Sequence, residues 1–134
     1  MDKLSGECLC GKVKFEVENE FDQFHLCHCK QCQRATGSAH ASNLFTRVDN
    51  INWLAGADSI KRYDVPNRVI SNAFCDACGS SLPYLSLSGK ALVIPAGCLN
   101  GKPNMSPQNN IFWSERAPWY DAAVLANPVS KFAD

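Results

Sequence analysis

Seven of the eight cysteines fall into three short clusters, and these clusters are the part of the chain best suited to chemistry. Thiolates that converge on one ion are typical of metal sites, and zinc is a common partner of cysteine sulfur. A closed structural zinc site takes four protein ligands, whereas a catalytic site takes three and keeps one position open. Two pairs and one triplet therefore predict one site of each kind. The clusters are Cys8-x-Cys10, Cys27-x-Cys29-x-x-Cys32 and Cys75-x-x-Cys78.

The two cysteine pairs are the candidates for the closed structural site. Side chains at positions i and i+2 of a strand point to the same face, so Cys8 and Cys10 can present two sulfurs together. Cys75 and Cys78 are followed by Gly79, which suits a tight turn whose thiolates hold an ion. Joining the pairs would tie the N-terminal strand to the middle of the chain and stabilise the fold directly.

The triplet is the candidate for the open, catalytic site, with its fourth position left to water, a substrate or a distant residue. Cys27, Cys29 and Cys32 would make a dication site net negative, so the ion would polarise water less than one held by neutral histidines. Such an ion suits an incoming thiol, because a metal lowers the pKa of a coordinated thiol. Lys30 and Arg34 either offset the negative charge and orient a substrate carboxylate or are solvated surface charges.

Four other residues bear on this assignment. His25, His28 or Cys98 could close the triplet as a second structural site. His28 lies between two proposed ligands, so on a strand its side chain would face away from them. His40 could line the site or donate a proton, and the alternative is a hydrogen-bonded, partly buried histidine. Cys98 could be a redox nucleophile, although a lone cysteine is usually a small buried hydrophobe.

Length and composition favour one soluble domain over residues 1–134. The chain has 134 residues, with 13 Lys and Arg against 13 Asp and Glu, so nothing indicates a nucleic-acid partner. No run reaches the roughly 18 apolar residues of a membrane span. The N-terminal residues lack a signal-peptide pattern, so we expect a cytoplasmic protein. In a reducing compartment, closely paired cysteines are metal ligands or redox centres rather than structural disulfides.

The apolar patterning predicts a mainly β fold. Short alternating or apolar segments, separated by turn signals about every ten residues, are typical of antiparallel sheets. No segment shows a sustained helical stripe, and residues 30–35 form one or two helical turns at most. We expect the closing segment 117–134 to wrap over the body as irregular chain. The expected strands cover residues 12–18, 23–26, 38–45, 51–54, 59–63, 69–74, 90–94 and 111–113.

The residues around the cysteines resemble the glutathione-dependent formaldehyde-activating (GFA) enzymes and their centromere protein V relatives. Residues 6–13 look like the opening signature of that family, residues 27–38 its central motif and residues 74–82 its third, with a weaker echo at 117–119. The resemblance implies a β-tent fold of antiparallel sheets around a structural zinc, and two zinc ions per chain. The structural ion would be held by Cys8, Cys10, Cys75 and Cys78, and the catalytic ion by Cys27, Cys29 and Cys32.

The resemblance also implies an activity. The reaction of the family joins formaldehyde and glutathione into S-hydroxymethylglutathione and is formally that of a carbon–sulfur lyase. A thiol would occupy the open zinc position and add to the aldehyde. The expected partners are therefore a small-molecule thiol such as glutathione and a small aldehyde, with no nucleic acid and no membrane.

Two other functions are compatible with the motifs. Cys98-Leu99-Asn100 resembles an element of methionine sulfoxide reductase B, which shares the β-tent and two C-x-x-C zinc pairs. In that hypothesis Cys98 is the redox nucleophile, although the first pair here is C-x-C and the triplet has no role. The other alternative is a non-catalytic, zinc-stabilised binding module. Cys98→Ser separates the reductase from the lyase, and thiol binding at the triplet separates the binding module from it.

Overall fold

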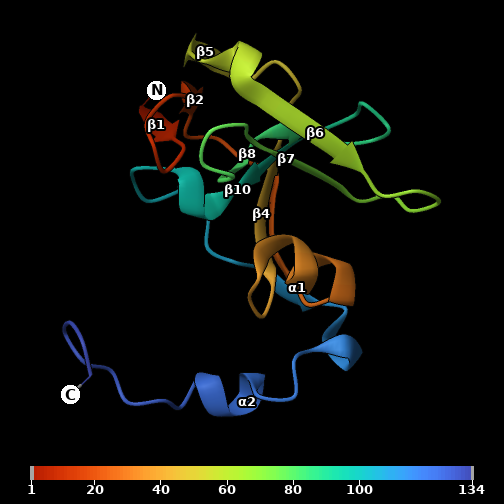
Figure 1. The fold of residues 1–134 in the computed structure, drawn as a ribbon, viewed down its shortest axis with the longest axis vertical. Coiled ribbons are helices and arrows are strands. Elements are labelled where there is room, and N and C mark those ends of the chain that lie inside the picture. The colour runs from red at the N-terminus through yellow and green to blue at the C-terminus, as the bar shows by residue number, and fades with distance from the viewer. Residues whose placement is uncertain (1, 134) are drawn as a thin grey trace.

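The computed structural model describes residues 2–133 and shows a mainly β protein with few short helices (Figure 1). The predicted fold class is confirmed. The helices are α1 (Lys30–Thr36) and α2 (Tyr120–Ala123), with 3-10 turns η1 (Ala57–Ser59), η2 (Ala96–Cys98) and η3 (Trp113–Glu115). The strands are β1 (Lys3–Glu7), β2 (Lys14–Glu18), β3 (Gln23–Cys27), β4 (Ala41–Thr46), β5 (Asn52–Ala55), β6 (Ile60–Asp64), β7 (Ser71–Cys75), β8 (Ser81–Leu82), β9 (Tyr84–Leu85), β10 (Leu92–Pro95) and β11 (Asn109–Ile111).

The strands form three sheets, and the largest carries the elements around the cysteine triplet. Its order is β11-β3-β4-β10-β9, and the two smaller sheets have the orders β1-β2-β5 and β6-β7-β8. All pairs are antiparallel except that of β11 with β3, which is parallel. A parallel neighbour needs a long crossover, and here most of the chain separates the two strands. The end of β3 is thus bordered by a late segment of the sequence.

The core lies where the sheets pack together. Phe15 and Val17 of β2 are buried as their alternation predicts, and they join Leu44 of β4 and Ile94 of β10 in one cluster. Gly6 of β1 lies directly against the ring of Phe15, and a Cβ atom there would collide with that ring. This close approach explains the glycine before the first cysteine pair. The packing thereby fixes the loop that carries Cys8 and Cys10.

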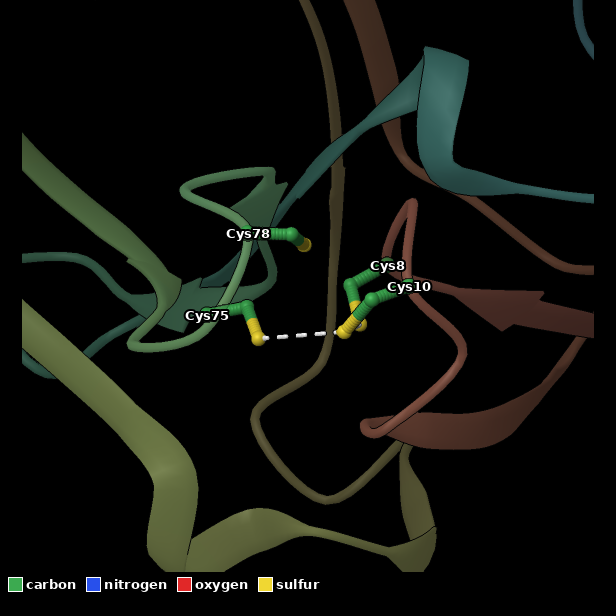
Figure 2. Close-up of side chains that lie close together, drawn as sticks. All are labelled: Cys8, Cys10, Cys75 and Cys78. Atoms are coloured by element: carbon green, nitrogen blue, oxygen red, sulfur yellow. Dashed lines mark hydrogen bonds between the residues drawn. The ribbon is translucent and has the colours of Figure 1, made fainter.

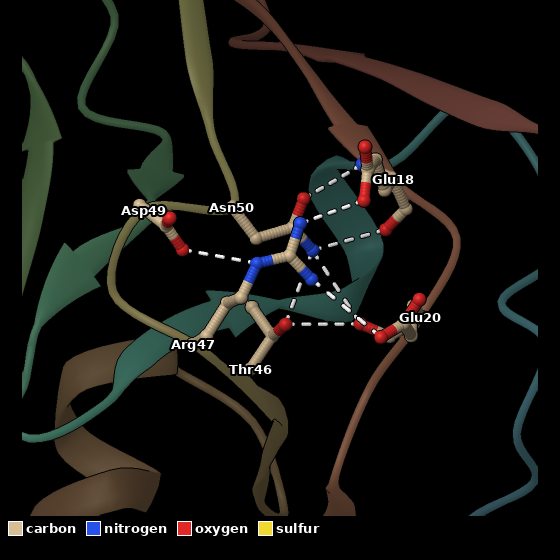
Figure 3. A network of polar contacts seen from close by, with 6 residues as sticks. All are labelled: Glu18, Glu20, Thr46, Arg47, Asp49 and Asn50. Atoms are coloured by element: carbon tan, nitrogen blue, oxygen red, sulfur yellow. Dashed lines mark hydrogen bonds and ion pairs between the residues drawn. The ribbon is translucent and has the colours of Figure 1, made fainter. Parts of the chain in front are cut away.

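A polar network fixes the connection between β4 and β5 to the end of β2 (Figure 3). Buried Asn50 accepts a hydrogen bond from the Glu18 backbone at 2.8 Å and donates to the Glu18 carbonyl at 3.0 Å. Arg47 pairs with Glu18 at 2.6 Å and with Asp49 at 3.0 Å. The side-chain amide of Asn50 thus provides hydrogen-bond partners for the backbone N–H and carbonyl of Glu18. This network is structural.

The last strand starts earlier than expected. β11 covers Asn109–Ile111 rather than residues 111–113, because Phe112 adopts a φ of 53° and Trp113 begins a 3-10 turn. Beyond α2 the chain runs along one end of the molecule in Figure 1, and residues 121–133 are exposed. Among the described residues, no helix is long and apolar enough to cross a membrane.

Candidate metal centres

The first cluster joins the two cysteine pairs. The sulfurs of Cys8, Cys10, Cys75 and Cys78 all lie within 4.8 Å of one another (Figure 2). Cys10 Sγ is 3.6 Å from Cys8 Sγ and 3.9 Å from Cys75 Sγ. Four sulfurs placed about 2.3 Å from a central zinc would be roughly 3.8 Å apart in a tetrahedron. The donor set and its spacing therefore fit a tetrathiolate metal site.

Two tight turns present these sulfurs. In the first, Gly11 donates its N–H to the carbonyl of Cys8 at 3.1 Å, and Val13 donates its N–H to Cys8 Sγ at 3.3 Å. In the second, Gly79 donates to the carbonyl of Cys75 at 2.8 Å. Both glycines have positive φ, 78° and 76°, a conformation that other residues rarely adopt. The sequence therefore builds each half of this site locally.

The two turns are also joined to each other by Ser80. Its hydroxyl accepts a hydrogen bond from the backbone N–H of Leu9 at 2.8 Å. Cys78 Sγ lies 3.3 Å from the same hydroxyl. The side-chain and backbone hydrogen bonds from Ser80 lower the pKa of the Cys78 thiol to about 5. Hydrogen bonds to the charged form stabilise it, so they favour the thiolate that metal binding needs.

The second cluster is the triplet. The sulfurs of Cys27, Cys29 and Cys32 lie within 4.8 Å of one another, and no histidine or carboxylate of residues 2–133 joins them. Cys27 ends β3, and Cys29 is the N-cap of α1, where its sulfur accepts the N–H of Cys32 at 3.3 Å. A strand end followed at once by a helix start thus brings three sulfurs together within six residues.

The triplet sulfurs differ in acidity because they share hydrogen bonds. The hydrogen bond from Cys32 lowers the pKa of Cys27 to about 6, against an opposing effect of burial, and Cys29 adds to the lowering. The same hydrogen bond with Cys27, together with burial, raises the pKa of Cys32. These hydrogen bonds favour the thiolate of Cys27, which is the form that binds a cation.

His28 holds the loop between the first two triplet cysteines and is not one of the clustered donors. Its backbone N–H donates to Ile111 of β11 at 2.9 Å, and its carbonyl accepts from Gln33 at 2.8 Å. Its fully buried ring pairs with Asn110 Oδ1 at 2.9 Å and packs against Tyr120 at 4.7 Å between centroids. The side chain thus points away from the sulfurs, as its position between two ligands predicts.

His25, His40 and Cys98 also lie outside the sulfur groups. His25 pairs with Gln23 at 2.9 Å, and the half-buried His40 pairs with Ser42 at 3.1 Å. Cys98 donates its thiol proton to the Pro95 carbonyl at 2.9 Å, and burial raises its pKa to about 12. None of these three residues caps the triplet among the described residues.

The triplet opens onto the largest of the described cavities, of about 710 Å³. Three cations line it, Lys30, Arg34 and Arg68, and none of them forms an ion pair among residues 2–133. One carboxylate, Glu115, also lines it and accepts the backbone N–H of Lys30 at 3.2 Å. Apart from the three sulfurs, the charged side chains of the lining are thus three cations and one carboxylate.

Several cavity residues carry no signal that sequence reasoning could use. Tyr84 lies in β9, a segment that the apolar pattern did not assign to a strand, and Arg68 lies in a loop beside an expected turn. Apolar side chains complete the lining, among them Phe45 of β4 and Ile111 of β11. These residues share only their closeness to the triplet in space. Their positions along the chain follow no regular spacing from which this closeness could be predicted.

Comparison with known proteins identifies the class. The glutathione-dependent formaldehyde-activating enzyme (GFA) family matches residues 3–115, so the chain belongs to this family. A curated relative, pyridoxine 5'-phosphate synthase from Porphyromonas gingivalis, is 25% identical over 123 residues. That match covers 90% of this chain and 50% of the relative, so the chain spans about half of the relative's length. A crystal structure of a Rhodobacter sphaeroides protein aligns with a TM-score of 0.60 and 24% identity, over 75% of this chain and 91% of that one. This last likeness concerns the fold alone.

Proposed function

We propose that this protein is a zinc-dependent carbon–sulfur lyase of the GFA type that adds an anionic thiol to a small aldehyde. The observation that carries the proposal is the three-sulfur cluster at a cavity of about 710 Å³ with three unpaired cations. Membership of the GFA family supports the same reaction class. Glutathione and formaldehyde are the substrates that the family description names.

The two sulfur groups would have different roles. Cys8, Cys10, Cys75 and Cys78 would hold a structural zinc, because four sulfurs fill a tetrahedral site. Cys27, Cys29 and Cys32 would hold the catalytic zinc and leave one position toward the cavity. When bound there, zinc would lower the pKa of a thiol so that it is present as the thiolate nucleophile.

The chain's own residues would bind and orient the substrate. Lys30, Arg34 and Arg68 would bind carboxylates of the thiol, and arginine does so with two parallel hydrogen bonds. The apolar part of the lining, including Phe45 and Ile111, would exclude water around the reacting sulfur. Holding thiol and aldehyde together removes much of the entropic cost of a bimolecular addition.

Binding of the thiol is the sharpest test. Titration of glutathione into the zinc-loaded protein, followed by calorimetry, should show one saturable site per chain. S-methylglutathione keeps both carboxylates but has no thiol proton to lose, so it should bind more weakly. Absence of glutathione binding would remove the lyase proposal and leave the non-catalytic binding module.

The reductase alternative is less well supported. A redox nucleophile needs an accessible thiolate, whereas the thiol of Cys98 is bonded to Pro95 and has a pKa raised to about 12. The reductase alternative also gives the three triplet cysteines no role. We further propose that the protein acts in the cytoplasm, where the eight cysteines, all free in the structure, would stay reduced.

A further inference from the structure

Tyr84 lies in the same cavity as the three triplet sulfurs. It is the first residue of β9, at the edge of the five-stranded sheet, and pairs with Val93 of β10. Its side chain lines the large cavity together with Cys27, Cys29 and Cys32, and also lines a smaller cavity beside Cys32. The Tyr84 side chain and the sulfur cluster thus face the same space.

The Tyr84 hydroxyl is a hydrogen-bond donor that is open to the cavity. It forms no hydrogen bond within residues 2–133, and it is not among the buried polar atoms that lack a partner, so water or a ligand can reach it. A tyrosine hydroxyl keeps its proton at neutral pH. It can therefore donate a hydrogen bond to water or to a ligand oxygen in the cavity.

The side chain of Arg62 packs over one face of the Tyr84 ring. The guanidinium carbon of Arg62 lies 5.6 Å from the centre of the Tyr84 ring. Arg62 is in turn fixed by Asp64 at 2.9 Å, Ser71 at 3.1 Å and the Leu85 carbonyl at 2.7 Å. A cation held by three acceptors under an aromatic face keeps that face in one position. The hydroxyl is thus presented by a rigid support, as an oxyanion donor requires.

We propose that Tyr84 is a catalytic residue that donates a hydrogen bond to the aldehyde oxygen during thiol addition. This inference rests on the proposed function. In the addition, the sulfur–carbon bond forms while the π electron pair of the carbonyl moves onto oxygen. The thiol loses its proton to solvent, and the aldehyde oxygen takes up a proton from solvent. Atoms and electrons therefore balance without an oxidant or reductant. The developing negative charge is the point at which a fixed donor lowers the barrier.

Three other uncharged polar side chains line the large cavity and could compete for this role, namely Gln31, Asn43 and Ser86. Ser86 is already engaged, because its hydroxyl lies 3.2 Å from that of Ser88 and accepts the N–H of Ala91 at 3.2 Å. Asn43 lines both cavities, as Tyr84 does, and is therefore the residue to compare with it. An amide is a weaker donor than a phenol, and nothing supports Asn43 as Arg62 supports Tyr84.

The test is Tyr84→Phe, which removes the hydroxyl and keeps the ring. In the zinc-loaded protein we expect the turnover number to fall about 100-fold, the usual effect of losing one oxyanion donor. The dissociation constant of glutathione, measured by calorimetry without aldehyde, should stay within twofold of the wild-type value. Tyr63→Phe is the matched control, because Tyr63 is an exposed tyrosine on β6 outside the cavity. Asn43→Ala tests the competing donor.

The outcomes separate the two proposals. Wild-type turnover in Tyr84→Phe, or a turnover loss only in Asn43→Ala, would overturn the role of Tyr84 and leave the lyase proposal standing. An equal loss of turnover and glutathione affinity would also overturn it, because the hydroxyl would then bind thiol rather than stabilise the transition state. A wild-type protein that binds no glutathione would overturn the proposed function itself, and this inference with it.

Discussion

The two cysteine clusters differ in where their sulfurs come from and in what surrounds them. The four-sulfur cluster joins turns that lie 65 residues apart, from Cys10 to Cys75, and its four donors would fill the coordination sphere of a tetrahedral ion. The three-sulfur cluster comes from one strand end and one helix start, and it opens onto a cavity. The four-sulfur cluster therefore links distant parts of the chain, whereas the three-sulfur cluster is formed by one short segment at the end of β3. Stability should depend on the first and chemistry on the second.

The largest expected effect comes from breaking the four-sulfur cluster. Cys75 is buried, so Cys75→Ser should prevent stable folding. Structural zinc contributes about 10–16 kcal/mol in small zinc domains, as much as the whole stability of a typical domain. Circular dichroism against temperature, with metal analysis, checks this. A cooperative transition within a few degrees of the wild type would contradict the structural role.

Breaking the three-sulfur cluster should separate activity from stability. In Cys29→Ser the hydroxyl can replace sulfur as the N-cap of α1, because serine is a favoured N-cap residue. We expect the melting temperature to stay within about 10 °C of the wild type. The variant should lose one zinc per chain and the binding of glutathione. Its turnover number should fall at least about 100-fold. If this variant unfolded, or if it kept its turnover, the proposal that stability and chemistry depend on different clusters would be contradicted.

The cations of the cavity should give a smaller effect, confined to binding. The double variant Arg34→Ala and Arg68→Ala should raise the KM for glutathione about tenfold with little change in kcat, since exposed charge pairs contribute about 0.2–1 kcal/mol each. For uncharged 2-mercaptoethanol the KM should not change. Lys61→Ala, which removes an exposed cation of β6 outside the cavity, is the matched control. An equal rise for both thiols would show that charge is not what the cavity recognises.

The smallest effect is expected at the cysteine that belongs to neither cluster. Cys98→Ser keeps a donor for the Pro95 carbonyl, so we expect a loss of about 1 kcal/mol in the free energy of unfolding and unchanged turnover. Denaturant titration and a steady-state assay check both values. Complete loss of turnover would instead favour the reductase alternative.

Local chemistry made both clusters readable in the sequence. The spacings of Cys8 with Cys10 and of Cys75 with Cys78 predicted two donor pairs, and Gly79 predicted the turn at the second pair. The strand expected at Cys8 and Cys10 was wrong, because β1 ends at Glu7 and these cysteines lie in a turn. The alternation in β2 predicted its buried face correctly. These predictions needed only the geometry of a strand, a turn and a few consecutive residues.

The surroundings of the triplet were not readable in this way. The expected strand at 111–113 was wrong in position, because Phe112 takes positive φ and the strand ends at Ile111, two residues earlier. The pairing of β11 with β3, which brings Asn110 to His28, is a parallel contact between segments 82 residues apart. No local pattern encodes such a partner, since it depends on which apolar faces are left uncovered elsewhere.

The sequence by itself determined which sulfurs lie together within each pair and within the triplet, because side chains a few residues apart are close in space in any compact fold. The meeting of the pair Cys8 and Cys10 with the pair Cys75 and Cys78 depended on the fold. Only the tertiary structure decided what faces those donors. Tyr84, Arg68 and Phe45 reach the cavity from a sheet edge, a loop and a central strand, brought together by the packing of the sheets. The physical reason is that burial of apolar surface is non-directional, so the position of a distant side chain follows from the whole core rather than from its neighbours in the chain.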